Sequence, residues 1–200
     1  MKATASKLVA ASAAFVLGLA AVSMAGGESG AIAAESTAPA WTIQPGGTLR
    51  FTVVNNGSEQ LKGEFRRWGG DIRMDPLTPE TAAIAIEIDL DSATMNDGFR
   101  DQLLRGGEFF NVDVTPKATF VSDTVEAQPD GRFVARGTLS MRGFSKPLDI
   151  EFRLTGGDDA KRVEGSATIE REPFEIGYGQ NGGSLDPSVA VEFAFDATRG

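Results

Sequence analysis

The chain has no cysteine and no histidine among its 200 residues. The absence of cysteine excludes disulfides, thiolate zinc sites and cysteine nucleophiles. The absence of histidine excludes Ser-His triads, imidazole metal ligands and the most frequent general base near neutral pH. Because most common catalytic and metal-binding machinery needs one of these side chains, we predict no catalytic site, no metal site and no cofactor.

Long hydrophobic runs are also scarce, and the longest one stands at the start of the chain. Residues 8–22 form an uncharged, mostly apolar run of 15 that follows Lys2 and Lys7. This run is shorter than the ~20 residues that span a bilayer, but its length is typical of a signal-peptide core. The small residues at 23–25 and 31–33 offer two cleavage sites, of which we favour the one after Ala33.

The sequence therefore predicts a signal peptide over residues 1–33 and a flexible segment over 34–40. We expect a periplasmic or secreted protein that has no stable membrane insertion after cleavage. An uncleaved N-terminal anchor is the alternative.

Positive charge is in short supply: 19 Lys and Arg stand against 28 Asp and Glu, a net charge of −9. Removal of residues 1–33 would take away two lysines and one glutamate and leave about −10. The only adjacent basic pairs are Arg66-Arg67 and Lys161-Arg162. Because an acidic surface repels phosphate backbones, we expect no nucleic-acid partner.

After residue 40 the dominant hydrophobic period is two, which is typical of strands with one buried face. The clearest rows are Ile84-Ile86-Ile88-Leu90, Leu148-Ile150-Phe152-Leu154 and Val189-Val191-Phe193-Phe195; weaker rows start at Leu49, Phe133 and Val163. Residues 55–57, 69–71, 129–131, 156–158 and 181–183 are rich in Asn, Asp and Gly and predict turns between them. About eight strands result, and an antiparallel sheet of this size closes into a barrel or folds into a sandwich.

One stretch interrupts the period of two. Phe99, Leu103 and Leu104 have helical spacing, and Gly106-Gly107 follow them. The spacing predicts a short helix over 97–105 that acts as a lid on one end of the sheet. Nothing in the sequence indicates a second domain.

Phenylalanine is unusually frequent, with 13 Phe against one Tyr and two Trp. An eight-stranded barrel is either filled by its side chains or left able to hold one small ligand. Small inward residues (Ala135, Gly137, Gly165 and Ala167) between rows of Phe favour an elongated dry slot, although small residues also suit tight barrel corners.

Five segments resemble the YceI-like family, in the order expected of that family. They are WTIQPGGTLRFTVVN from residue 41, GEFRRWGGDI around residue 70, RDQLLRGGEFFNVDVTPKATF over 100–120, GTLSMRGFSKPLDIEF over 137–152 and REPFEIGYG near the end. The resemblance spans 41–198, nearly all of the chain after the predicted leader.

This resemblance implies an all-β fold, an eight-stranded antiparallel lipocalin-like barrel that holds a polyisoprenoid or similar long-chain amphiphile. It also implies export, in agreement with the leader. Members often carry a His-Ser pair early in the first strand, where this chain has Gly47-Thr48.

By the resemblance, Arg100 and Asp101 stand at the start of the lid helix, where we favour a cap and an ion pair that position the lid over direct contact with a ligand. Phe109 and Phe110 should point to opposite sides of an extended segment, so that only one of them lines the slot. Lys146 lies in the turn after Gly143, where we favour a solvated side chain over contact with a headgroup.

The candidate ligand-binding residues are the large apolar side chains of these rows and of the lid. They are Phe51, Phe65, Ile84, Ile86, Ile88, Phe99, Leu103, Leu104, Phe109, Phe110, Phe120, Leu139, Met141, Ile150, Phe152 and Phe174. The sequence thus favours a non-catalytic exported lipid carrier for storage or transport.

Two other functions stay open. Glu151, Glu170, Glu172 and Glu175 are candidates for a hydrolase that works with paired carboxylates, although Glu151 alternates with an apolar row and should face solvent. A non-catalytic stress or interaction module is the other alternative. The sequence also leaves homodimer formation open.

Overall fold

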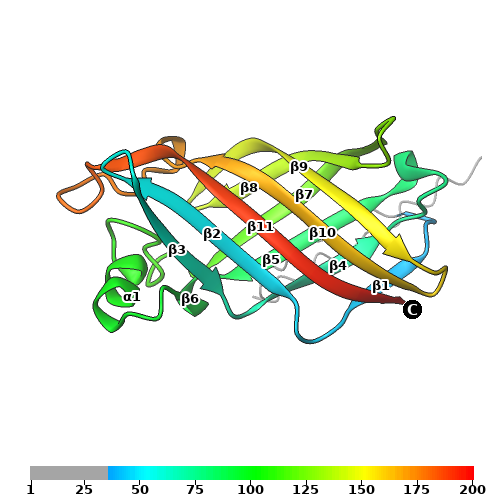
Figure 1. The fold of residues 1–200 in the computed structure, drawn as a ribbon, viewed down its shortest axis with the longest axis horizontal. Coiled ribbons are helices and arrows are strands. Elements are labelled where there is room, and N and C mark those ends of the chain that lie inside the picture. Colours follow the sequence, from blue (N-terminus) through cyan, green and yellow to red (C-terminus); the bar gives the residue numbers. More distant parts are fainter. Residues whose placement is uncertain (1–35) are drawn as a thin grey trace, which may run out of the picture.

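The computed structural model describes residues 36–200, which form one antiparallel β-barrel with a short helix at one end (Figure 1). The predicted signal peptide over 1–33 and both cleavage sites lie outside the described residues. Within the described part of the chain, no helix is long and apolar enough to cross a membrane.

Eleven strand segments build the sheet, and all of their pairings are antiparallel. They are β1 (Ala40–Ile43), β2 (Thr48–Asn55), β3 (Glu59–Phe65), β4 (Trp68–Arg73), β5 (Ala83–Asp89), β6 (Ala93–Thr94), β7 (Lys117–Ala127), β8 (Phe133–Met141), β9 (Phe144–Gly156), β10 (Ala160–Glu170) and β11 (Leu185–Arg199). The helices are α1 (Gly98–Arg105) and the 3₁₀ turns η1 (Pro79–Thr81), η2 (Leu90–Ser92) and η3 (Glu172–Phe174).

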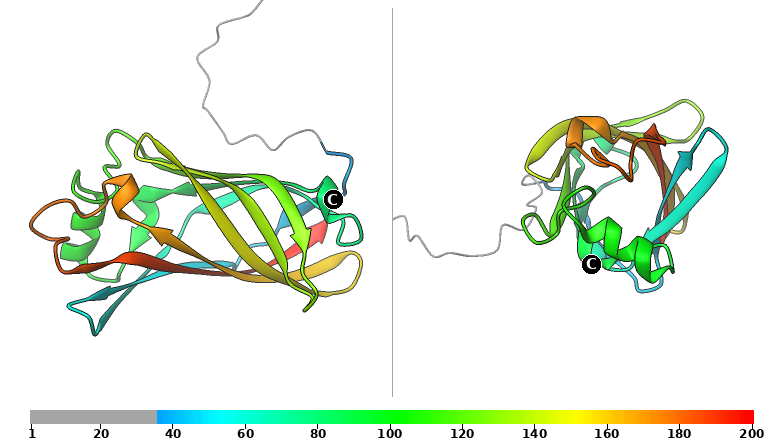
Figure 2. Two further views of the ribbon diagram at one scale, coloured as in Figure 1. Left: turned by 90° about the horizontal axis from the view of Figure 1, so that it is seen from above. Right: turned by 90° about the vertical axis from the view of Figure 1, so that its left-hand side faces the viewer.

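The barrel closes because β11 pairs with both β1 and β2. β1 and β2 are two halves of the first barrel strand, β3 and β4 are halves of the second, and β5 and β6 are halves of the third, interrupted by η2. The other five segments are whole barrel strands, which confirms the predicted eight-stranded antiparallel barrel. Figure 2 shows the closed wall from its end.

One predicted turn is wrong. Residues 69–71 lie inside β4, where Gly70 pairs with Ile86. A Cβ atom on Gly70 would stand 2.1 Å from the carbonyl oxygen of Ala85. Gly70 therefore allows two strands to approach closely, a role whose sequence signal is the same as that of a turn.

The lid helix forms where the spacing predicts it. The carboxylate of Asp97 accepts hydrogen bonds from the amides of Phe99 and Arg100 and caps the first turn of α1. Asp101 attaches the helix to the barrel, since its carboxylate accepts bonds from the Met95 amide (2.6 Å) and the Thr94 hydroxyl (2.7 Å). Desolvation works against ionisation of Asp101, but these bonds outweigh it and hold the pKa of its carboxyl below the ordinary value.

The ladder between β9 and β10 is incomplete. It runs from Gly156 paired with Lys161 to Glu151 paired with Ser166. The residues of β9 before Glu151 pair with β8, and the residues of β10 after Ser166 pair with β11. The turn η3 packs against β9 at this gap, which we call the seam.

The end of the barrel away from α1 is covered by residues 38–41, which lead into and begin β1. Ala38 is buried, the Met74 amide donates to the Pro39 carbonyl, and the Trp41 indole N–H donates to the Met74 carbonyl at 2.8 Å. The predicted flexible segment over 34–40 thus includes a buried residue and, at Ala40, the first residue of β1.

Candidate ligand-binding tunnel

The barrel interior holds two adjoining apolar cavities. A cavity of about 140 Å³ lies at the end closed by Trp41, the narrow end, and one of about 470 Å³ lies at the end that carries α1, the lid end. Both are bounded by the same ring of five side chains: Leu49, Ile88, Leu139, Ile169 and Val191. Because they share these five wall residues, the two cavities adjoin end to end inside the barrel, and we call the pair the tunnel.

The narrow cavity is walled by side chains of regular strands. Besides the shared ring, its walls are Trp41, Trp68, Ile72, Met74, Pro76, Ile84, Ile86, Phe120, Ala135, Leu148, Ile150, Phe152, Leu154, Lys161, Val163, Ala167, Phe193, Phe195 and Ala197. The rings of Trp68 and Phe195 meet edge to face with centroids 5.5 Å apart, and those of Phe133 and Phe152 stack at the same separation. A cavity of this kind is suited to a hydrocarbon chain, and Lys161 is the one charged residue among its walls.

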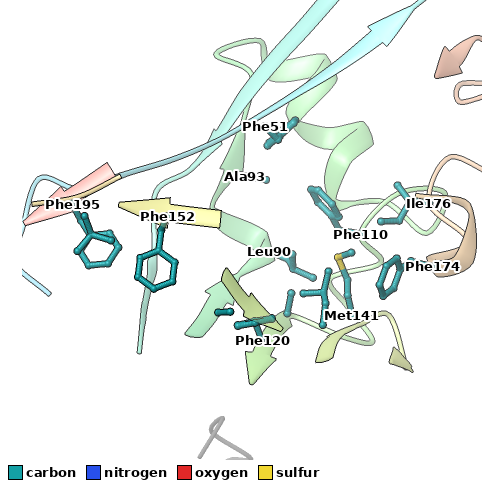
Figure 3. Close-up of a cluster of buried hydrophobic side chains, with 14 of the residues drawn as sticks. Phe51, Leu90, Ala93, Phe110, Phe120, Met141, Phe152, Phe174, Ile176 and Phe195 are labelled. Carbon is teal, nitrogen blue, oxygen red and sulfur yellow. The ribbon is translucent and has the colours of Figure 1, made fainter. Parts of the chain in front are cut away.

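The wide cavity is walled by strands and by the segments that cover the lid end. Besides the shared ring, its walls are Phe51, Val53, Asn55, Leu61, Phe65, Leu90, Met95, Phe99, Arg100, Leu103, Leu104, Phe109, Phe110, Ala118, Met141, Arg171, Ile176, Asn181, Leu185 and Val189. Its volume lies within the range of small-molecule sites, and only four of these side chains are polar. Figure 3 shows Phe110, Met141 and Ile176 gathered with Phe174 at this end, apart from Phe152 and Phe195.

Arg171 is the most buried of the four polar side chains, with 7% of its surface exposed. Its guanidinium donates to four main-chain carbonyls between residues 176 and 186, at 2.6–3.2 Å. One side chain therefore organises the whole segment between η3 and β11, and it supplies the hydrogen bonds that a buried charge requires.

Arg142 and Glu108 hold the rest of the lid end together. Arg142 donates to the carbonyls of Gly107, Phe109 and Phe174. The Glu108 carboxylate accepts from the Asn181 side chain (2.8 Å) and from the amides of Asn181 (2.7 Å) and Gly182 (3.1 Å). The bond from the Asn181 side chain, together with the two amide bonds, lowers the pKa of Glu108 below its ordinary value against a smaller opposing effect of burial.

Several inward glycines do not leave free space. A Cβ atom on Gly63 would lie 2.2 Å from the ring of Phe51, and one on Gly165 would lie 2.4 Å from the ring of Phe193. A Cβ on Gly137 would also meet the ring of Phe120 at 2.8 Å. Neighbouring rings thus cover these glycines, so Gly137 and Gly165 do not widen the slot, whereas Ala135 and Ala167 do line the narrow cavity.

The structure places all of the predicted site residues except Phe174 on the walls of the tunnel. Ile84, Ile86, Phe120, Ile150 and Phe152 line the narrow cavity, Ile88 and Leu139 belong to the ring, and the others line the wide cavity. Their contact with a ligand stays a prediction.

Phe174 has a different position from the predicted one. It is buried in η3 and lies outside both cavity walls, and its carbonyl accepts a hydrogen bond from Arg142 at 2.9 Å. Its ring belongs to the buried core next to Met141, outside the walls of the two cavities (Figure 3).

The expectations for Phe109, Phe110 and Lys146 are wrong. Residues 107–110 are turns and not extended chain, so both phenylalanines are buried and both line the wide cavity. Lys146 lies within β9, half-buried on the face that carries Leu148 and Ile150, and not in a turn. The turn is Arg142-Gly143, both with positive φ, and it closes a two-residue hairpin between β8 and β9.

Arg100 and Asp101 both act at the lid but not on each other. Asp97 provides the cap and Asp101 the attachment, while Arg100 lies 3.8 Å from Glu59 and lines the wide cavity.

Sequence reasoning missed about two thirds of the residues in the tunnel wall. Val189, Val191 and Phe193 show the same alternation as the chosen rows, so their signal was present. Arg171 and Asn181 had no such signal, because the hydrogen bonds that place them join segments that irregular loops bring together.

The four carboxylates considered for hydrolysis are exposed, and none of them lines the tunnel. Glu151 pairs with Arg132, and Glu170 accepts a hydrogen bond from Ser188 at 2.6 Å. This placement gives no support to an acid-base pair facing a bound substrate.

Gly47, which replaces the histidine that other members carry, has no room for a side chain. A Cβ atom there would lie 2.8 Å from Cβ of Phe195 and 3.0 Å from the ring of Trp68. In this chain the two rings fill the space that a side chain at position 47 would need.

A closed eight-stranded antiparallel barrel with an apolar tunnel defines a lipocalin-like class of protein. The profile of the YceI-like domain matches residues 41–197, so the chain belongs to the YceI-like family. A UPF0312 protein of Pseudomonas aeruginosa (strain LESB58) is 34% identical over 134 residues, which are 64% of this chain and 70% of the relative.

Two solved structures share the fold. Burkholderia cenocepacia BcnA superposes with a TM-score of 0.72 at 19% identity, over 76% of this chain and 96% of that one. A polyisoprenoid binding domain from Saccharophagus degradans, implicated in plant cell wall breakdown, gives a TM-score of 0.65 at 16% identity, over 81% of this chain and 99% of that one.

Proposed function

We propose that this protein binds a polyisoprenoid or a similar long-chain amphiphile inside its barrel, for storage or transport in the periplasm or outside the cell. The observation that carries the proposal is the pair of adjoining apolar cavities inside the barrel, because a site walled by hydrocarbon suits a hydrocarbon ligand. The polyisoprenoid-binding name of the Saccharophagus degradans neighbour supports the same ligand class, and the predicted signal peptide supports export.

The driving force for such binding is the removal of apolar surface from water. At about 0.8 kcal/mol per buried methylene, each five-carbon isoprene unit contributes roughly 3–4 kcal/mol before ordering costs. A tail of several units therefore binds without a charged anchor.

The two cavities give the ligand a direction. Trp41 and Met74 close the narrow end, so the apolar tail enters first and ends there. The polar end then lies in the wide cavity, where Asn55, Arg100 and Asn181 supply hydrogen-bond donors near the surface.

Organic extraction of the protein purified from its native compartment, followed by mass spectrometry, tests the proposal. We expect one long-chain lipid per barrel, and after its removal we expect binding of added prenols. Recovery of an empty barrel that also refuses prenols would reject the function.

A matched pair of variants tests whether the tunnel is the site. Val191 belongs to the shared ring, and its neighbour Ala190 is exposed on the outer face of the same strand. Val191→Phe should block the passage between the two cavities and weaken the binding of long prenols by about tenfold or more for each isoprene unit excluded, while short prenols still bind. Ala190→Phe should leave the binding of long and short prenols unchanged, and equal effects of the two substitutions would show that the ligand binds elsewhere.

A further inference from the structure

Three of the four large hydrophobic side chains that are most exposed in the described part of the chain belong to segments at one end of the molecule. Among the described residues, Phe99, Val114, Tyr178 and Leu77 have the largest exposed apolar surfaces, with 70%, 71%, 64% and 90% of their area accessible. The first three come from α1, from the segment between α1 and β7, and from the segment between η3 and β11. These segments cover the lid end, which faces the viewer in the right-hand view of Figure 2. Leu77 lies near the narrow end, next to Pro76 of the narrow cavity wall.

Hydrogen bonds hold these three segments in place. The N-cap bonds to Asp97 fix the turn that carries Phe99, and the Val114 amide donates to the Asn111 carbonyl at 3.0 Å. Tyr178 follows Gly177, whose amide donates to the Glu108 carbonyl at 2.7 Å. The three side chains therefore project from braced backbone, and their exposure is a fixed property of the fold.

We propose that the lid end docks on an uncharged lipid surface through Phe99, Val114 and Tyr178. The inference rests on the proposed function, because a cargo with a long apolar tail resides in bilayers. Phe99 links the docking surface to the ligand site, since its side chain is exposed and also lines the wide cavity. A lipid leaving the cavity at Phe99 would meet the bilayer without crossing water.

The charges near these residues favour a zwitterionic surface over an anionic one. The chain has a net charge of −9, and the basic side chains of α1 have acidic neighbours, Arg105 at 2.8 Å from Asp91 and Arg100 at 3.8 Å from Glu59. Docking must then come from apolar insertion, which is typical of Tyr and Phe at the headgroup level and little affected by salt.

The spacing of the three side chains favours a bilayer over a protein partner. They come from three separate segments, and each has a polar or charged residue close to it in the sequence: Asp97 before Phe99, Asp113 before Val114 and Gln180 after Tyr178. Protein interfaces need a continuous desolvated core, whereas single side chains insert independently between lipid headgroups.

The lack of cysteine allows a clean labelling experiment on the whole chain. Val114→Cys, Tyr178→Cys and Leu77→Cys would each carry an environment-sensitive nitrobenzoxadiazole dye and be mixed with phosphatidylcholine vesicles. We expect the emission to rise and shift to the blue at positions 114 and 178, in low and high salt alike, and to stay unchanged at position 77. A response at all three positions, at none, or only with anionic lipid would overturn the proposal.

Vesicle flotation supplies a measurement without a dye. Val114→Ser combined with Tyr178→Ser should lower the bound fraction by about tenfold or more, whereas Leu77→Ser should leave it unchanged. Neither Val114 nor Tyr178 lines the tunnel, so binding of a fluorescent prenol without vesicles should be the same in all of these variants.

The prenol measurement separates the two proposals. If the unsubstituted protein binds prenol but does not bind vesicles, or binds a protein partner and no vesicles, docking on a bilayer is rejected and the lipid-binding function stands. If it binds no prenol, the proposed function is rejected, and with it the transfer role of the lid end.

Discussion

At the narrow end of the tunnel nearly all of the wall residues belong to regular strands, whereas at the wide end a helix, turns and loops complete a wall that strands begin. The narrow cavity is walled by side chains from ladders that continue around the barrel. The wide cavity depends on α1 and on two irregular segments that Arg142, Arg171 and Glu108 join through main-chain hydrogen bonds.

This difference indicates a division of labour within one tunnel. A ladder changes shape only if many hydrogen bonds break together, so the narrow end should fix how long a tail fits. The lid end is held by a few side chains, each of which can be changed singly, so it should govern entry, release and the polar end of the ligand. Four substitutions test this comparison, and the largest effect is expected first.

Arg171→Met should be the most destabilising change at the lid end. It removes the donor that serves four carbonyls between residues 176 and 186, and we expect a loss of about 4 kcal/mol in the free energy of unfolding. Urea unfolding of the delipidated protein measures it. The control is Arg105→Met, which removes an exposed ion pair with Asp91 and should cost about 1 kcal/mol or less. Equal losses in the two variants would show that Arg171 does not organise the lid end.

Phe195→Ala tests the narrow end in the same assay. The buried ring packs edge to face on Trp68, and its removal should cost about 3 kcal/mol and enlarge the narrow cavity. Because the ladder stays intact, the variant should still bind prenols and should accept a longer chain than the unsubstituted protein. A variant that loses prenol binding altogether would contradict the assigned role of this end.

Ala167→Met should shorten the narrow cavity without disturbing the ladder. The larger side chain takes the place of two or three carbons of the tail. The affinity for the longest bound prenol should therefore fall by about 20-fold, and the affinity for short prenols should stay the same. Thr168→Met, on the exposed outer face of the same strand, is the matched control for titration with a prenol length series. If both variants keep the same length preference, the narrow cavity does not measure chain length.

Glu108→Gln should have the smallest effect and should act on release. The substitution removes the carboxylate that accepts three hydrogen bonds from Asn181 and Gly182, so the loop loosens and a bound fluorescent prenol should leave severalfold faster. Because folding lowers the pKa of Glu108, its contribution is complete above the ordinary value of about 4.3 and is lost as the pH falls through the lowered one. Release from the unsubstituted protein should therefore accelerate as the pH falls below the ordinary value and through the lowered one, and release from the variant should lack this dependence on Glu108. If release from the unsubstituted protein and from the variant responds to pH in the same way, another titratable group causes the response.

The fold could be predicted because each of its signals is local. Ile84, Ile86 and Ile88 predict a strand by alternation alone, and the spacing of Phe99, Leu103 and Leu104 predicts the lid helix. The turn predicted at 69–71 failed because a glycine such as Gly70 serves close strand approach equally well.

The apolar walls of the site could be predicted on the strands and on the lid, but the polar contacts that assemble the lid end could not. Alternation places Phe120 and Ile150 inward without knowledge of their neighbours. The lid end instead depends on contacts between distant parts of the chain, such as Glu108 with Asn181 and Arg142 with Phe174. Nothing local in the sequence pairs these residues, which is why Phe174 was assigned to the wall and Arg171 was not considered.

The seam between β9 and β10 has a consequence for self-association. A strand edge with free amides and carbonyls invites a strand from another molecule, and the part of β9 before Glu151 presents such an edge beside η3. Pro147 stands in the middle of this stretch and has no N–H to donate, and Lys146 next to it adds a positive charge. This edge is therefore protected against intermolecular sheet growth, so the incomplete ladder at the seam does not expose the barrel to edge-to-edge aggregation.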